Sequence, residues 1–129
     1  MDYTFPKKEK LKSKKLIERM FTEGSSVSKY PLRVVYIKND DWFEAFTIQA
    51  GFSVPKRKFK KAVDRNKVKR LMREAYRLNK ELIFNNLETS HAFMFLYLGK
   101  EIPDFQELNT AMQKLLNKFI SKIQQESNS

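Results

Sequence analysis

The chain of 129 residues contains no cysteine, so it can form no disulfide framework, thiol nucleophile or thiolate zinc site. No apolar run approaches the ~20 residues that a membrane-spanning helix needs. The lysines near the N-terminus are not followed by an apolar core of signal-peptide length. These absences lead us to expect a soluble, unexported protein of the cytoplasm.

Groups suited to catalysis are also scarce. A protein nuclease typically needs paired carboxylates that hold metals, or paired histidines. The only histidine, His91, adjoins an apolar run and is expected to be a loop or core residue. Asp40 and Asp41 suit a turn, and Asp64 and Asp104 suit helix caps. We therefore expect no catalytic residue and no metal ligand in this chain.

Positive charge, by contrast, is abundant and concentrated in one segment. Residues 56–80 contain twelve Lys and Arg against two acids, which gives this segment +10 of the chain's net +11. Such a charge favours a nucleic acid or an anionic membrane surface as the partner.

The chain is long enough for one domain, and its 41% hydrophobic content supports a folded core. We expect a basic, flexible lead-in at residues 1–12, one domain at 13–125, and a frayed tail at 126–129.

In the first half of the domain, a helix capped by Ser13 and ended by Gly24 is expected. Residues 24–31 have the composition of a loop. A strand is predicted at 32–38, and residues 42–54 alternate between apolar and polar positions as one bent strand or two.

In the second half, we predict a helix over 64–85 capped by Asp64. Residues 92–98 form a continuous apolar run, which is typical of a central strand buried on both faces. Asp104 and Glu107 form a capping box that opens a last helix. The order αβββαβα predicts an α+β fold, a two-layer α/β sandwich.

The basic helix separates into two sides when its residues are placed at ~100° per residue. One side carries a cationic column with further polar residues beside it: Arg65, Lys69, Arg73 and Arg77, flanked by Asn66, Arg70 and Lys80. The opposite side is apolar: Val68, Leu71, Met72, Ala75, Leu78 and Leu82. Such a helix can pack on a sheet and display cations to a polyanion. A merely solvated charged face is the alternative. A membrane-binding helix is disfavoured because this apolar side lacks the Trp and Phe of interfacial helices.

The residue order of this segment resembles the signature of the bacterial ribonuclease P protein component. The resemblance rests on GFSVPKR at 51–57 and RNKVKRLMREAYR at 65–77, and it extends over about residues 11–98. Lys67 stands where the family usually has a second Arg. The loop at 58–61 also departs from the family's pattern. It has lysines and Phe59 where many members carry a Gly-Asn turn, and it is one residue longer.

The resemblance implies a left-handed βαβ crossover, an exception to the usual handedness. It also implies contacts with a catalytic RNA, which we assign to Lys56, Arg57, Arg65, Asn66, Lys67, Lys69, Arg70, Arg73 and Arg77. A cleft for the 5′ leader of precursor tRNA would be lined by Ile17, Phe21, Val35 and Tyr36. Phe52 is a further aromatic candidate for this cleft, although a core position is favoured for it. A core position is also the alternative for Phe21 and Tyr36.

The same resemblance implies that the RNA subunit, with bound magnesium, cuts the phosphodiester bond. The protein would bind no cofactor by itself and would be monomeric without RNA. Its partners would be ribonuclease P RNA and precursor tRNA. The main alternative is a general RNA-binding or ribosome-binding protein with no role in tRNA processing.

Overall fold

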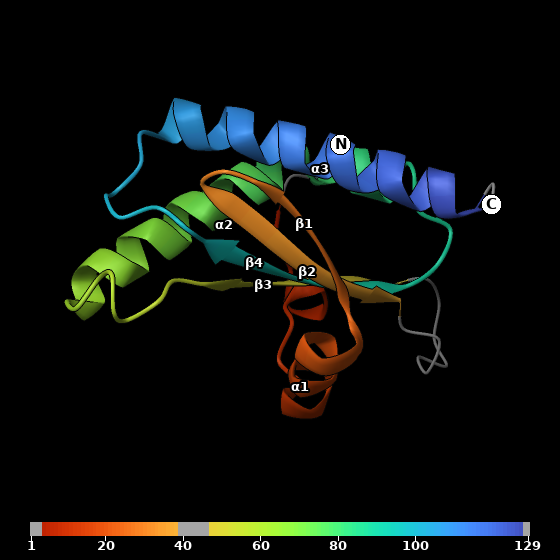
Figure 1. The fold of residues 1–129 in the computed structure, drawn as a ribbon, viewed down its shortest axis with the longest axis horizontal. Helices are drawn as coiled ribbons and strands as arrows, with labels where there is room; N and C mark the ends of the chain where they lie inside the picture. Colours follow the sequence, from red (N-terminus) through yellow and green to blue (C-terminus); the bar gives the residue numbers. More distant parts are fainter. Residues whose placement is uncertain (1–3, 39–46, 128–129) are drawn as a thin grey trace.

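The computed structural model describes residues 4–38 and 47–127, which form three α-helices, a short 3₁₀ helix and four strands (Figure 1). Along the chain they are η1 (Lys7–Glu9), α1 (Lys14–Glu23), β1 (Ser25–Lys29), β2 (Leu32–Lys38), β3 (Ile48–Ser53), α2 (Ala62–Phe84), β4 (His91–Tyr97) and α3 (Phe105–Ser127).

The four strands form one mixed sheet in the order β1-β2-β4-β3. β1 pairs with β2 and β2 with β4 in antiparallel fashion, whereas β3 and β4 are parallel and are connected through α2. α2 and α3 lie on one side of the sheet, and α1 lies on the other (Figure 1). The predicted α+β class and the layer of helices on a sheet are confirmed. The handedness of the β3-α2-β4 crossover stays a prediction from the family resemblance.

The ends of α1 follow the capping rules. The Ser13 hydroxyl accepts a hydrogen bond from the Leu16 amide at 3.2 Å, and the Gly24 amide donates to the Met20 carbonyl at 2.9 Å. A Cβ atom on Gly24 would lie 2.7 Å from the Tyr36 carbonyl oxygen. Glycine therefore allows the chain to turn directly from α1 into β1 beside β2.

The expectation of a loop over residues 24–31 was wrong. Residues Ser25–Lys29 form β1, which pairs with β2 as a hairpin through a cis Tyr30–Pro31 peptide bond. This edge strand buries only one apolar side chain, Val27, and its remaining serines and lysine are at least partly exposed. Composition alone cannot distinguish such a strand from a loop, because its stability comes from pairing with β2.

Other element boundaries differ by a few residues. α2 begins at Ala62, where Lys61 occupies the cap position without a side-chain cap bond. Asp64 thus lies in the first turn and is not the cap. Its negative charge there interacts favourably with the helix dipole. α3 continues through Ser127, past the point where fraying was expected. The predicted strand at 42–54 corresponds to β3, and its residues 42–46 lie outside the described residues.

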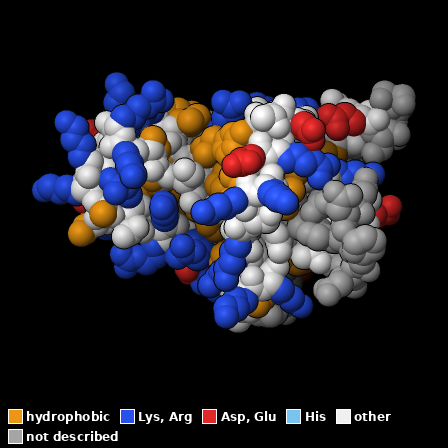
Figure 2. All heavy atoms as spheres, turned by 90° about the horizontal axis from the view of Figure 1, so that it is seen from below, with side chains coloured by type: hydrophobic (Ala, Val, Ile, Leu, Met, Phe, Trp, Pro, Cys, Tyr) orange, Lys and Arg blue, Asp and Glu red, His pale blue; other side chains and the backbone are white. Residues whose placement is uncertain are grey.

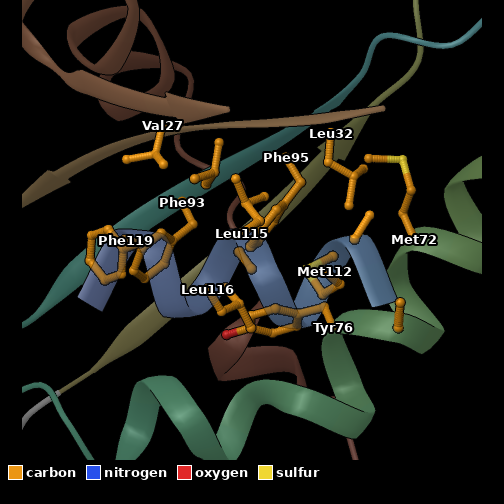
Figure 3. Packing of buried hydrophobic residues seen from close by; sticks show 14 of the residues in the cluster. Val27, Leu32, Met72, Tyr76, Phe93, Phe95, Met112, Leu115, Leu116 and Phe119 are labelled. Atoms are coloured by element: carbon orange, nitrogen blue, oxygen red, sulfur yellow. The ribbon is translucent and has the colours of Figure 1, made fainter. Parts of the chain in front are cut away.

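The main hydrophobic core lies between the sheet and the pair α2 and α3 (Figure 3). Phe93 and Phe95 of β4 meet Phe119, Leu115 and Met112 of α3. A smaller cluster covers the opposite face of the sheet under α1, and its buried members are Leu16, Met20, Val35, Ile37, Ala92 and Met94. β4 contributes to both clusters, so its predicted place as an interior strand buried on both faces is confirmed.

The lead-in, which we expected to be mobile, has defined contacts in the structure. The Leu11 amide donates to the Ala50 carbonyl at 3.0 Å along the edge of β3. The ring of Phe5 lies 5.9 Å from that of Tyr76. Lys80, which the helical wheel placed beside the exposed cations, is only 3% exposed, and its Nζ lies 2.9 Å from the carboxylate of Glu9. Lys80 is therefore part of the packing between lead-in and α2.

This buried ion pair generates a stability prediction. Glu9→Leu should lower the free energy of unfolding by about 3 kcal/mol, because it leaves the Lys80 ammonium buried without its carboxylate. The double variant Glu9→Leu with Lys80→Met should return to within about 1 kcal/mol of the wild type, since neither charge remains. Urea unfolding followed by circular dichroism measures both. If the free energy of unfolding of the Glu9→Leu variant equalled that of the wild type, the lead-in would not pack on α2 in solution.

Candidate nucleic-acid interface

α2 separates its cations from its apolar side chains largely as predicted. Val68, Met72 and Ala75 are buried, while most of the predicted RNA-contacting side chains are exposed or partly exposed. The exposed ones are Asn66, Lys67, Arg70 and Arg73, and the partly exposed ones are Arg65, Lys69 and Arg77. Among the residues placed on the apolar side, Leu78 is the exception, with 40% of its surface exposed.

Arg77 and Arg73 each contact another side chain of the protein. The guanidinium of Arg77 forms an ion pair with Glu74, and the hydrogen bond between them raises the pKa of Arg77. The guanidinium of Arg73 lies 5.9 Å from the ring centre of Phe52, although its side chain is exposed. Glu74 therefore offsets one charge of the column, as expected for crowded cations on one helix.

The segment between β3 and α2 extends the cationic surface. Lys56 and Arg57 are exposed, as the prediction required, and so are Lys60 and Lys61. Sequence reasoning missed the anchor of this segment, Phe59, which is 6% exposed. Its position among five basic residues was the available signal, because an isolated aromatic in such a run is a candidate for burial.

The proposed cleft residues are divided between the two faces of the sheet. Ile17 and Val35 belong to the cluster under α1, and Phe21, one helical turn after Ile17, is 54% exposed. Tyr36 belongs instead to the main core, where its ring centre lies 4.7 Å from that of Phe119. Placing Tyr36 with Val35 was wrong, because successive strand residues point to opposite faces.

Phe52 packs with the main core, as its favoured interpretation stated. Its ring stacks on Phe95 at 5.6 Å and lies 5.9 Å from those of Phe5 and Tyr76. Phe21 is thus the only exposed aromatic among the cleft candidates, since Tyr36 and Phe52 belong to the other side of the sheet.

Two residues on the face of Val35 were not predicted. Arg33 is exposed and is paired across the strands with Leu96, which is partly exposed. Arg33 also donates a hydrogen bond to the Ser26 hydroxyl at 3.1 Å. Strand alternation is the signal that could have found Arg33, because it lies two positions before Val35.

Viewed from the α1 side, hydrophobic side chains lie beside a dense group of Lys and Arg (Figure 2). The group covers the end of the molecule where α2 begins, and more Lys and Arg surround α1 (Figures 1 and 2). Apolar surface flanked by cations suits a nucleic-acid strand whose phosphates and bases make separate contacts.

The remaining chemistry-bearing residues are packed or dispersed. His91 is 6% exposed, its Nδ1 lies 2.9 Å from the Thr89 carbonyl oxygen, and its ring stacks on Phe93. Within residues 4–38 and 47–127, no three His, Asp or Glu residues lie close enough together to hold a metal. The helices in these two stretches are also too short or too polar to cross a membrane.

Comparisons with known proteins agree on one family. The family described as Ribonuclease P matches residues 5–120. The ribonuclease P protein component of Porphyromonas gingivalis is 42% identical, over 85% of this chain and 82% of its own. That of Dictyoglomus turgidum is also 42% identical, over 90% of this chain and 92% of its own.

Solved structures show the same fold. The ribonuclease P protein from Thermotoga maritima superposes with a TM-score of 0.68 at 25% identity, over 85% of this chain and 96% of its own. The Staphylococcus aureus protein gives a TM-score of 0.66 at 21% identity, over 84% of this chain and 93% of its own.

The assignment of Phe21 to the surface and of Tyr36 to the core can be tested by measuring stability alone. Phe21→Ala should change the free energy of unfolding by no more than about 0.5 kcal/mol, because most of that side chain faces solvent. Tyr36→Ala should cost about 3 kcal/mol, because it opens a cavity beside Phe119. Equal costs in urea unfolding would contradict the assignment of Phe21 to the surface and Tyr36 to the core.

Proposed function

This chain belongs to the family of ribonuclease P protein components, and from that membership we propose that it is the protein subunit of a ribonuclease P. It binds the catalytic RNA and the 5′ leader of precursor tRNA, and thereby promotes endonucleolytic removal of the leader. The observation that carries the proposal is the cationic face of α2, which displays the family's signature residues on a helix anchored in the core.

The catalytic RNA binds along this face and the segment before it. Each phosphate contact by a Lys or Arg releases condensed counterions from the RNA. This release supplies much of the binding free energy, and the affinity therefore falls as the salt concentration rises. Arg70 and Arg73 offer planar guanidinium groups that can bind phosphate through two hydrogen bonds. Lys67, in place of the family's usual Arg, supplies a point charge without that geometry.

The leader of precursor tRNA binds on the opposite side of the sheet, beside α1. Ile17 and Leu96, both partly exposed, provide apolar surface there above the buried Val35, and Arg33 provides a cation. Phe21 is the ring on which a base can stack, and such stacking contributes about 1 to 3 kcal/mol per base. Recognition of this kind tolerates many leader sequences, because every base has a face that can stack.

The RNA subunit, with its bound magnesium, performs the hydrolysis, and the protein supplies binding and orientation. The protein alone binds no cofactor, is monomeric without RNA, and acts in the cytoplasm. It favours precursor over mature tRNA because only the precursor carries the leader, which is discrimination through differential affinity.

Reconstitution tests this assignment against its main alternative. Protein freed of RNA should not cleave precursor tRNA in magnesium, whereas adding it to a bacterial ribonuclease P RNA at low magnesium should increase cleavage at the 5′ leader junction. The added protein relieves the repulsion between the two RNA molecules and holds the leader. Cleavage is measured with end-labelled precursor tRNA.

Two results would contradict the proposal. Cleavage by the protein alone would identify a self-sufficient nuclease. Binding to ribosomal RNA with no stimulation of the ribonuclease P RNA would favour a general RNA-binding or ribosome-binding protein.

Substitutions on the two surfaces should also have different effects, one on assembly with the RNA and the other on binding of the leader. Arg70→Ala should weaken assembly with the RNA and reduce the slope of log Kd against log salt by about one, the loss of one phosphate contact. Phe21→Ala should leave assembly unchanged and reduce binding of leader-bearing precursor by about fivefold or more, while binding of mature tRNA stays the same. Filter binding of holoenzyme and substrate measures these effects.

Lys114→Ala is the matched control, because Lys114 is an exposed lysine of α3 and its loss changes the net charge equally. It should alter neither assembly nor substrate discrimination. Identical effects of Arg70→Ala and Phe21→Ala on assembly would rule out two separate surfaces.

A further inference from the structure

The loop of residues 55–61, between β3 and α2, is held in one conformation by several contacts. The amides of Lys58 and Phe59 both donate to the Pro55 carbonyl at 3.3 Å. The Phe59 ring is buried, 5.9 Å from the ring of Tyr97. The Lys58 ammonium donates to the Leu98 carbonyl at 2.6 Å. The loop is therefore attached to the end of β4 at two points.

A further attachment comes from α2 itself. The Nη1 group of Arg65 donates to the carbonyl of Phe59 at 2.7 Å and to that of Lys60 at 3.0 Å. This arginine therefore bends back over the start of its own helix. Its side chain is partly buried, in contrast to Arg70, which is exposed one to two turns further along.

We propose that Arg65 is a positioning residue that holds the loop so that its cations bind RNA phosphates together with those of α2. The four exposed cations of the loop are Lys56, Arg57, Lys60 and Lys61. This inference rests on the proposed function, because it assigns a role within the same RNA-binding surface. It differs from the simpler expectation, in which Arg65 contributes only its own phosphate contact.

The physical reason is the entropy of the loop. Ordering a flexible backbone loses conformational entropy at every residue, and a loop that must be ordered on binding has a correspondingly weaker affinity. Carbonyl acceptors fixed by a guanidinium keep residues 59 and 60 in place before RNA arrives. A phosphate then meets cations that already have fixed positions relative to α2.

The two roles of Arg65 predict different salt dependences. A direct contact accounts for about one unit in the slope of log Kd against log salt. A positioning role accounts for more, since the loop cations lose their placement when Arg65 is removed. Arg65→Met should therefore lower the slope by about two or more, whereas Arg70→Met, the matched control on the same helix, should lower it by about one.

A double-mutant cycle gives an independent measure. The loop variant combines Lys56→Gln, Arg57→Gln, Lys60→Gln and Lys61→Gln. Its effect on Kd for a bacterial ribonuclease P RNA should be about tenfold smaller in the Arg65→Met background than in the wild type, because the cations are already misplaced. In the Arg70→Met background its effect should be undiminished, as expected for independent contacts.

A slope loss for Arg65→Met equal to that for Arg70→Met, with additive effects in both cycles, would overturn the proposal and leave Arg65 as a direct contact. Circular dichroism establishes that Arg65→Met is folded. If it is not, Arg65→Gln takes its place in both measurements and the same outcomes decide. Failure of the wild-type protein to bind the RNA would instead refute the proposed function.

Discussion

The structure depends on α2 burying one side in the core while a crowded row of cations stays in water on the other. Each like-charged pair one turn apart costs about 0.2 to 0.5 kcal/mol. Burying a side chain such as Met72 contributes about 1.5 to 3 kcal/mol, and α2 buries several. The apolar side therefore outweighs the repulsion by a wide margin. The cations can be concentrated on this helix because the core, and not their mutual pairing, holds it in place.

This arrangement makes the availability of each cation a structural question. The segment 56–80 looks uniform in charge, yet its members differ in their surroundings. Lys80 is buried against Glu9, Arg77 is paired with Glu74, and Arg65 donates to loop carbonyls. Arg70 and Lys67 remain exposed. The surface presented to a polyanion is thus smaller than the charge count suggests and includes the loop before the helix.

Much of the fold could be predicted because its signals are local. The caps of α1, the apolar run of β4 and the stripe of α3 each appear within one element. β1 could not be recognised, because a serine-rich edge strand is stabilised by its partner. The burial of Lys80 could not be predicted either, since its partner Glu9 lies 71 residues earlier and nothing local indicates their contact.

The candidate site was predicted unevenly for the same reason. Exposed helix positions follow from periodicity, so Arg70 and Arg73 were identified correctly as surface residues. Tyr36 was assigned to the cleft through family resemblance although its neighbour Val35 already occupied that face. Strand alternation was the stronger constraint, and applying it would have selected Arg33 in its place.

The separation of the two sheet faces also limits how the proposed leader-binding surface can bind a single strand. The aromatic residues of the sheet, among them Tyr36, Phe52 and Phe93, are directed into the core between the sheet and the helices α2 and α3. Among residues 4–38 and 47–127, the large exposed ring on the other face is Phe21, supplied by α1. One ring can stack one base at a time, so most of the affinity for a single strand must come from phosphate contacts with cations such as Arg33. Phosphate contacts carry no sequence information. The proposed function requires binding of this kind, and here it would follow from using the other aromatics of the sheet to build the core.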